Sequence, residues 1–145
     1  MEKNTIEIKN ENETESFGKR LAEQAKPGTV IALIGDLGVG KTTLTKSIAR
    51  GLGIDDTITS PTFNLIRQYE GGRLPLYHFD VYRIADIEEM YEIGFEEYIY
   101  GDGVCLIEWA NLISELLPEN IISVDISKAL DKGFDYRKIT VINNG

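Results

Sequence analysis

A glycine-rich turn that ends in a lysine and a hydroxyl residue lies at residues 35–42 and has the spacing G-x-x-x-x-G-K-[ST]. Glycines allow successive backbone N–H groups to point inward around an anion, and a helix that follows adds its positive N-terminal dipole. In such a loop the lysine contacts the β- and γ-phosphates of a nucleotide, and the next hydroxyl binds Mg²⁺. The pattern therefore predicts a nucleotide site formed by Asp36, Leu37, Gly38, Val39, Gly40, Lys41, Thr42 and Thr43. A chance match is the alternative, but the motif stands between an apolar run and an amphipathic segment, where a phosphate-binding loop belongs.

Two carboxylates at the ends of apolar runs are the candidates for turning nucleotide binding into hydrolysis. The run LYHFD ends in Asp80, and the run VCLIE ends in Glu108. A nucleotide hydrolase needs an acid at the end of a strand beside the phosphate-binding loop, to hold the metal or its water. The second run is the more apolar and resembles a central strand, so Thr42 and Glu108 are the predicted metal ligands. Lys41, Asp80 and Glu108 are the predicted catalytic residues, although strand-end carboxylates also occur as plain surface charges.

Several other residues near these motifs allow two interpretations each. The segment TSPTF, residues 59–63, has the small hydroxyls and stiffening proline of a switch that senses a γ-phosphate, but an ordinary connecting loop has the same composition. His78 is the single histidine and alternates with aromatic residues, which favours a packed or half-exposed structural role. Trp109 follows Glu108 and either lies beside the site or belongs to the core. Cys105 lies in an apolar run and is expected to be a buried thiol.

Apolar periodicity predicts the helices and strands that must position these groups. Helices are expected at residues 10–28, 40–53, 86–99 and 111–118. Strands are expected at residues 5–9, 29–34, the end of 57–72, 74–84, 103–110, 121–127 and 136–143. Asn12 with Glu15 is the predicted N-terminal cap of the first helix, and Asp86 with Glu89 forms the same pair at the third. Gly71-Gly72 marks a hairpin turn.

The order of these elements predicts the fold class. Residues 29–34 are almost entirely apolar, which is typical of a strand covered on both faces. Strands alternate with helices, and the chain contains no repeat, low-complexity tract or linker. Residues 1–145 are therefore expected to form a single α/β domain of the P-loop NTPase type. Its central sheet should be mostly parallel and flanked by helices, with antiparallel strands at the termini.

Composition limits the partners of the chain. The 145 residues carry 24 acidic and 15 basic side chains, a formal net charge of −9, which argues against unaided binding to nucleic-acid phosphates. Residues 86–102 contain seven acids and no lysine or arginine, so this segment is either a solvated face or a docking surface for a basic partner.

One cysteine excludes an intrachain disulfide. The first residues lack the apolar core of a secretory signal, and no apolar run is long enough to span a membrane, so a soluble cytoplasmic protein is expected.

Four blocks of the sequence together resemble a known family. GDLGVGKTT, SPTF, LYHFDVYRI and CLIEWA occur in the order and spacing of the bacterial TsaE (YjeE) family of small P-loop ATPases, and the resemblance covers about residues 10–118. It implies a role in making N6-threonylcarbamoyladenosine in tRNA together with the TsaD–TsaB pair, in which TsaD transfers the threonylcarbamoyl group. It also implies that residues 36–43 hold ATP, that Thr42 and Glu108 hold Mg²⁺, and that Asp80 belongs to the catalytic site. Residues 60–62 would be the switch, and the stretch around residues 13–14 would lie near the adenine.

Two other functions remain open on the residues alone. A small-molecule kinase needs an arginine-rich lid to close over its substrates, whereas the segment that follows Asp80 is acidic. A GTPase-like switch is expected to carry a guanine-reading N-K-x-D segment, which the sequence lacks. An acidic ATPase that acts on tRNA only through partners agrees best with these features. The sequence has no conventional arginine finger, so Arg83 or a group from a partner is the candidate for that role.

Overall fold

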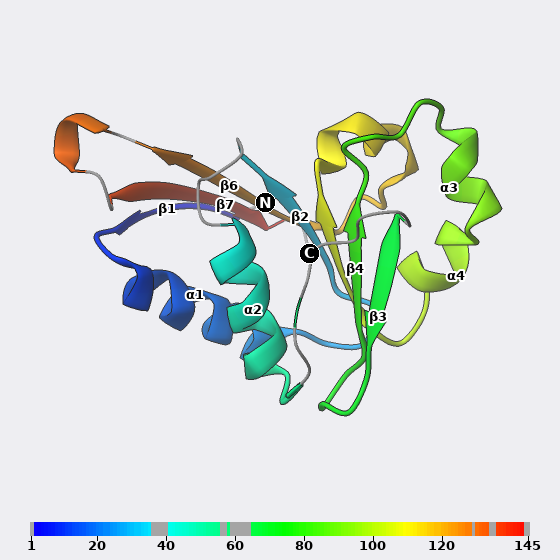
Figure 1. Cartoon of the computed structure of the whole chain (residues 1–145), viewed down its shortest axis with the longest axis horizontal. Coiled ribbons are helices and arrows are strands. Elements are labelled where there is room, and N and C mark those ends of the chain that lie inside the picture. The colour runs from blue at the N-terminus through cyan, green and yellow to red at the C-terminus, as the bar shows by residue number, and fades with distance from the viewer. Residues whose placement is uncertain are drawn as a thin grey trace.

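The computed structural model describes residues 2–35, 41–55, 58, 65–128, 130–133 and 136–143, and its strands form one seven-stranded sheet in the order β1-β7-β6-β2-β5-β4-β3 (Figure 1). The strands are β1 (Glu2–Ile8), β2 (Val30–Ile34), β3 (Ile66–Tyr69), β4 (Leu76–Asp80), β5 (Val104–Glu108), β6 (Ile122–Lys128) and β7 (Arg137–Asn143). Four adjacent strands, β6, β2, β5 and β4, run parallel. β3 pairs antiparallel with β4 at one edge, and β7 and β1 continue the sheet antiparallel at the other. The predicted fold class, with a parallel centre and antiparallel terminal strands, is confirmed.

The apolar run at residues 29–34 becomes β2, which lies between β6 and β5. Val30, Ile31, Ala32 and Leu33 are all buried, because helices cover both faces of the sheet at this position. β5 is buried along its whole length for the same reason. β2 and β5, which lead into predicted site residues, are therefore the best-buried strands of the sheet. Packing on both faces fixes the positions of their carboxyl ends.

Helices cover the two faces of the sheet in separate groups. They are α1 (Glu11–Gln24), α2 (Lys41–Gly51), α3 (Glu88–Glu92), α4 (Phe95–Ile99) and the 3₁₀ helices η1 (Ala110–Leu116) and η2 (Leu130–Lys132). On one face, Phe17 of α1 and Leu44 of α2 share a core with Leu33 and Leu106. On the other face, α3, α4 and η1 pack against residues such as Phe79 and Ile107. Because strand residues alternate between faces, β2, β4 and β5 contribute to both cores, while the buried residues of β1, β6 and β7 lie in the first core.

The cap of α1 differs from the prediction by two residues. Asn10, not Asn12, is the N-cap, and its side chain accepts a hydrogen bond from the Glu13 backbone N–H at 3.0 Å. Glu13 in turn accepts from the backbone N–H of Lys9 at 2.8 Å. Both asparagines have a glutamate three residues later, and β1 decides between them because it ends at Ile8, so the helix begins directly after the strand.

The predicted helix at residues 86–99 is wrong as one element, since it consists of the two short helices α3 and α4. Gly94 lies between them with φ 74°, a left-handed conformation that ends the first helix and that glycine adopts without strain. The predicted pair makes two hydrogen bonds, since Asp86 accepts from the Glu88 backbone N–H at 3.1 Å and Glu89 accepts from the Asp86 backbone N–H at 3.2 Å. The N-cap of α3 is nevertheless Ile87 and not the predicted Asp86, because the helix begins at Glu88. The chain therefore starts this segment close to the predicted residue and breaks it at the glycine.

Candidate functional site

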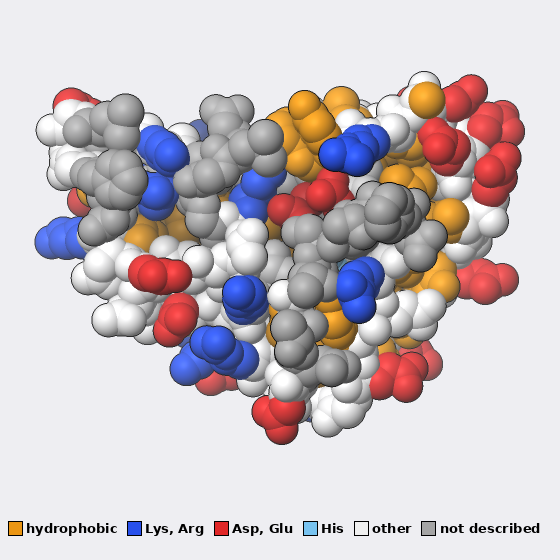
Figure 2. Space-filling view, viewed as in Figure 1, with side chains coloured by type: hydrophobic (Ala, Val, Ile, Leu, Met, Phe, Trp, Pro, Cys, Tyr) orange, Lys and Arg blue, Asp and Glu red, His pale blue; other side chains and the backbone are white. Residues whose placement is uncertain are grey.

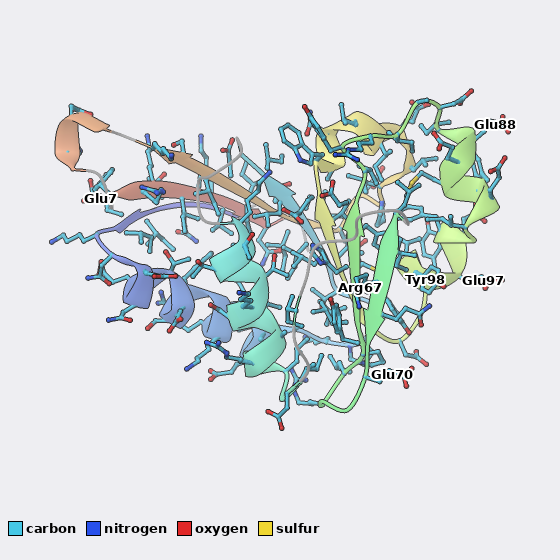
Figure 3. The ribbon with its side chains drawn as sticks, in the orientation of Figure 1. Glu7, Arg67, Glu70, Glu88, Glu97 and Tyr98 are labelled. Carbon is cyan, nitrogen blue, oxygen red and sulfur yellow. The ribbon has the colours of Figure 1, made fainter. Side chains whose placement is uncertain are left out.

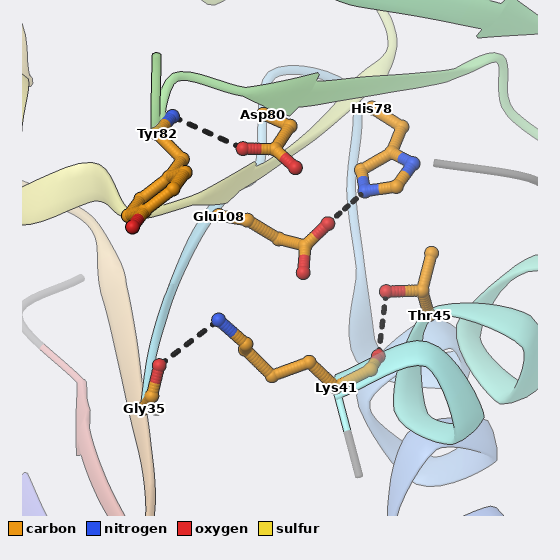
Figure 4. Close-up of polar contacts among 7 residues, drawn as sticks. All are labelled: Gly35, Lys41, Thr45, His78, Asp80, Tyr82 and Glu108. Carbon is orange, nitrogen blue, oxygen red and sulfur yellow. Dashed lines mark hydrogen bonds and ion pairs between the residues drawn. The ribbon is translucent and has the colours of Figure 1, made fainter. Parts of the chain in front are cut away.

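The candidate site lies where the carboxyl ends of three neighbouring parallel strands meet the beginning of α2. Glu108, the last residue of β5, is in register with Asp80, the last residue of β4, and with Leu33 near the end of β2. α2 begins at Lys41, after the short segment that follows β2. In parallel α/β sheets this edge is the one where ligands bind. The fold thus brings together Lys41, Asp80 and Glu108, which are far apart in the chain (Figure 4).

Lys41 is buried although it carries a charge, with only 6% of its surface exposed. Its Nζ donates a hydrogen bond to the Gly35 carbonyl at 2.9 Å, and it also lies 4.2 Å from the centroid of the Trp109 ring. Both contacts are favourable to an ammonium group, because the carbonyl oxygen and the face of an indole are each electronegative. The two contacts hold the lysine amine at the end of β2, next to the first residue of the predicted phosphate-binding loop.

Trp109 has an unusual backbone conformation. Its φ of 61° makes it the single non-glycine residue with a positive φ among the described residues. Such a conformation is strained for a bulky residue and is found mostly at functional sites. It turns the chain directly after Glu108 and puts the indole over Lys41 and beside the ring of Tyr82, with 4.6 Å between the ring centroids. The ring also packs on the core beneath it, so both interpretations of Trp109 apply.

Glu108 is a buried carboxylate that contacts a buried histidine. It is 6% exposed, and its Oε2 lies 2.7 Å from Nε2 of His78, which is 1% exposed. The predicted packed position of His78 is confirmed, but its contact with Glu108 was not foreseen. The sequence places His78 two residues before Asp80 and so on the same side of the sheet, but the contact with Glu108 depends on the pairing of β4 with β5.

Asp80 is half-buried and closes the turn after β4. Its Oδ1 accepts a hydrogen bond from the Tyr82 backbone N–H at 3.0 Å. Figure 4 shows its carboxyl group on the side of the sheet where Glu108 and Lys41 lie. Arg83 follows in the same turn and is exposed. Asp80 therefore borders the site from β4, while Glu108 forms its buried floor.

The remaining predicted residues are only partly described. Thr42 is exposed in the first turn of α2, and the hydroxyl of Thr43 donates to Oε1 of Glu11 at 3.0 Å. This bond joins the beginning of α2 to the beginning of α1, where residues 13–14 stand. The predicted phosphate-binding residues Asp36, Leu37, Gly38, Val39 and Gly40 lie outside the described residues. So does the predicted switch at residues 59–63.

The donors near the site are the kind that Mg²⁺ uses. Within the described ranges, no three His, Cys, Asp or Glu side chains are grouped closely enough to hold a metal ion on their own. Mg²⁺ in nucleotide sites takes one or two carboxylates, and the substrate phosphates and water complete its shell. The Glu108 carboxylate and the Thr42 hydroxyl supply hard oxygen donors next to the loop. These residues fit a nucleotide-bound Mg²⁺ and do not fit a metal cage built by the protein alone.

The acidic segment at residues 86–102 lies away from this site, on the outer side of α3 and α4. Figure 2 shows acidic side chains gathered over these helices, and Figure 3 shows Glu88 and Glu97 on their outer side. All of its acids are exposed except Glu89, which is half-buried at the cap of α3. This exposure agrees with both predicted interpretations, a solvated face and a docking surface for a basic partner. Among the described residues, no helix has the length and apolar character needed to cross a bilayer.

Comparison with known proteins gives a consistent result over most of the chain. The family model described as "Threonylcarbamoyl adenosine biosynthesis protein TsaE" matches residues 8–139. The tRNA threonylcarbamoyladenosine biosynthesis protein TsaE of Bacillus subtilis (strain 168) is 51% identical over 131 residues, 90% of this chain and 80% of that protein. The TsaE protein of Treponema pallidum (strain Nichols) is 43% identical over 129 residues, 89% of this chain and 93% of that protein. The crystal structure of Bacillus subtilis YdiB superimposes with a TM-score of 0.81 at 44% identity, covering 99% of this chain and 87% of the YdiB chain.

Proposed function

This chain belongs to the TsaE family of threonylcarbamoyl adenosine biosynthesis proteins, and we propose that it is an ATP-binding and ATP-hydrolysing accessory protein of tRNA N6-threonylcarbamoyladenosine formation. Family membership confirms the resemblance carried by the four sequence blocks. We propose that the reaction of this chain is Mg²⁺-dependent hydrolysis of ATP and that its partner is the TsaD–TsaB complex. We also propose that the chain acts in the cytoplasm.

One observation carries the ATPase proposal: Lys41, Asp80 and Glu108 converge at the carboxyl edge of the parallel strands, against the first turn of α2. Residues 36–43 would hold the phosphates of ATP, and the N-terminal end of α2 would add its dipole. Lys41 would exchange the Gly35 carbonyl for the β- and γ-phosphates. That exchange moves a positive charge to the place where negative charge develops during hydrolysis.

The two carboxylates would divide the remaining work according to their positions. Thr42 and Glu108 would hold Mg²⁺, which neutralises phosphate charge when bound. Asp80 has a more open position at the border of the site and already accepts a hydrogen bond from the Tyr82 backbone. We assign it to orienting the attacking water. Arg83, which is exposed in the same turn, or a group from the partner complex would supply the further positive charge.

The charge of the chain supports an indirect role toward tRNA. A formal net charge of −9 opposes tight binding to a phosphate backbone. The acidic side chains over α3 and α4 strengthen this effect on one side of the molecule. The threonylcarbamoyl transfer itself would therefore belong to the TsaD–TsaB complex, and ATP hydrolysis by this chain would support repeated turnover of that complex.

The experiment is a measurement of ADP release from Mg·ATP by the pure protein, alone, with the TsaD–TsaB complex, and with the complex and tRNA. A several-fold change in rate caused by the complex, absent in Lys41→Ala, is the expected result. If the complex neither binds nor alters turnover, the partnership is refuted. ADP release that depends instead on a small hydroxyl substrate would make the chain a kinase.

A further inference from the structure

The hydrogen bond between His78 and Glu108 is a deeply buried polar contact of the candidate site. Their side chains are 2% and 9% exposed, and 2.7 Å separates His78 Nε2 from Glu108 Oε2. The residues lie on the adjacent parallel strands β4 and β5, thirty positions apart in the chain. Since Asp80 is in register with Glu108, His78 reaches the carboxylate diagonally from two positions earlier on the same face.

The direction of this bond follows from its chemistry. We assign Glu108 as the acceptor, because an ionised carboxylate can only accept; the ring then carries its proton on Nε2 and donates it to Oε2. The other ring nitrogen, Nδ1, is shielded from solvent and has no hydrogen-bond partner among the described residues. A buried polar atom without a partner lowers stability. The bond to Glu108 is the polar contact that the imidazole makes among the described residues.

The bond has a geometric consequence for Glu108. A glutamate has three rotatable bonds between its backbone and its carboxyl group and can take many orientations. His78 holds one oxygen, Oε2, and Figure 4 shows the other oxygen directed toward the start of α2, on the side of Lys41. That is the direction in which a metal ion between Glu108 and the phosphates would lie. Replacing a side chain that holds a metal-binding carboxylate in this way typically lowers metal affinity or activity about 10–100-fold.

We propose that His78 is a positioning residue, which fixes the orientation of the Glu108 carboxylate so that its second oxygen faces the metal-bound nucleotide. This role rests on the proposed function and adds a residue to it. His78 touches neither nucleotide nor metal in this proposal and acts only through Glu108. The prediction is therefore specific: loss of the bond should weaken the dependence of nucleotide binding on Mg²⁺ and leave metal-free nucleotide binding unchanged.

The test compares three variants of His78 in a binding assay with ADP, so that no turnover is involved. His78→Gln places an amide N–H at the distance of Nε2 and should keep the bond. His78→Asn is polar but too short to reach, and His78→Leu removes the donor. We expect the half-saturating Mg²⁺ concentration for ADP binding to rise about 10–100-fold in the Asn and Leu variants and about 3-fold or less in the Gln variant. ADP affinity in excess chelator should remain within about 3-fold of wild type in all three.

A second measurement needs no nucleotide at all. Because the chain has one histidine, a ¹H–¹⁵N spectrum of the imidazole contains the signals of His78 alone. The proton is expected on Nε2, and Glu108→Ala should shift its resonance strongly. A ring that carries its proton on Nδ1 only would overturn the proposal, because such a ring cannot donate to Glu108.

Controls separate this proposal from the proposed function and from a general loss of stability. Leu76→Val alters the same face of β4 at a fully buried position and should lower the melting temperature without changing the Mg²⁺ requirement. If wild-type protein binds ADP equally well with and without Mg²⁺, the proposed metal-dependent function fails. If wild type requires Mg²⁺ but the Asn and Leu variants match it, only the positioning role of His78 fails. If the Leu variant does not fold, the difference between Gln and Asn decides.

Discussion

Lys41 and Trp109 form a cation–π contact, with 4.2 Å between the amine and the ring centroid, and the same amine donates to the Gly35 carbonyl. Trp109 takes a left-handed backbone conformation to reach this position. The lysine is thereby held close to the predicted phosphate-binding loop. Under the proposed function, ATP would draw the amine away from the Gly35 carbonyl, so binding and rearrangement of this contact would be coupled.

Trp109 should report nucleotide binding by its fluorescence. It is the only tryptophan in the chain, and the emission of an indole depends on charges near the ring. We expect a saturable change in emission when Mg·ATP is added, because Lys41 moves relative to the ring. The change should be absent or much smaller in Lys41→Ala when nucleotide binding is verified independently. An identical change in that variant would show that the signal arises from another movement.

Lys41→Ala should reduce ATP hydrolysis about 100-fold or more, the effect typical of removing one preorganised donor to developing charge. The buried position of the lysine stem makes a test of folding necessary, by circular dichroism and thermal unfolding. Lys46→Ala is the matched control, since Lys46 is exposed on the same helix and outside the site. A folded Lys41→Ala protein with wild-type turnover would refute the phosphate-binding role.

Glu108→Gln should reduce turnover about 100-fold and raise the Mg²⁺ concentration required. The amide keeps the size of the side chain and can still accept from His78, so the fold should be preserved. Glu115→Gln removes an exposed acid from η1 and serves as the control for loss of one charge. A metal titration of Glu108→Gln that matches wild type would move the metal-binding role to Asp80, and Asp80→Asn would then show the shifted titration.

The sequence predicts the elements of this fold well where local pattern and packing agree. β2, β5 and α2 follow directly from apolar runs and periodicity. Two details depend on the rest of the fold. Asn10 and Asn12 are equivalent as caps until the end of β1 is known. Gly94 would cost only about 1 kcal/mol inside a helix, so its presence alone does not predict the break, which the structure shows between the buried residues Met90 and Phe95 of the two helices.

For the candidate site, motif spacing predicts Lys41, Asp80 and Glu108, because Lys41 belongs to a recognisable loop motif and each carboxylate ends a recognisable strand; the structure brings the three together. The contact between His78 and Glu108 could not be read in the same way, since it requires that β4 lie next to β5 in a particular register. The conformation of Trp109 has no sequence signal either, because an aromatic residue is rarely left-handed. Pairwise contacts between strands therefore need the topology, even where the separate residues are evident.

Cys105 allows a prediction of pH dependence. Its thiol is 1% exposed and donates to the Tyr98 carbonyl at 3.3 Å, and burial raises its pKa from 9.0 to about 12. The buried environment disfavours the thiolate, so in the folded protein the proton is retained, while the unfolded chain loses it above about pH 9. This contribution to stability is complete below pH 9 and is lost as the pH rises toward 12.

The free energy of unfolding, measured with urea in the presence of a reductant, should therefore fall more steeply with pH for wild type than for Cys105→Ala. Between pH 8 and pH 10 the extra loss should be about 1.4 kcal/mol, since one unit of pH corresponds to that amount once the unfolded thiol is ionised. The alanine variant removes only the small buried thiol group and should be less stable by a constant amount at every pH. The test therefore compares the slopes of the two pH profiles. Parallel pH profiles for the two proteins would contradict the raised pKa. Slow alkylation of native Cys105 at pH 8, accelerated by urea, would confirm separately that the thiol is buried in the folded protein.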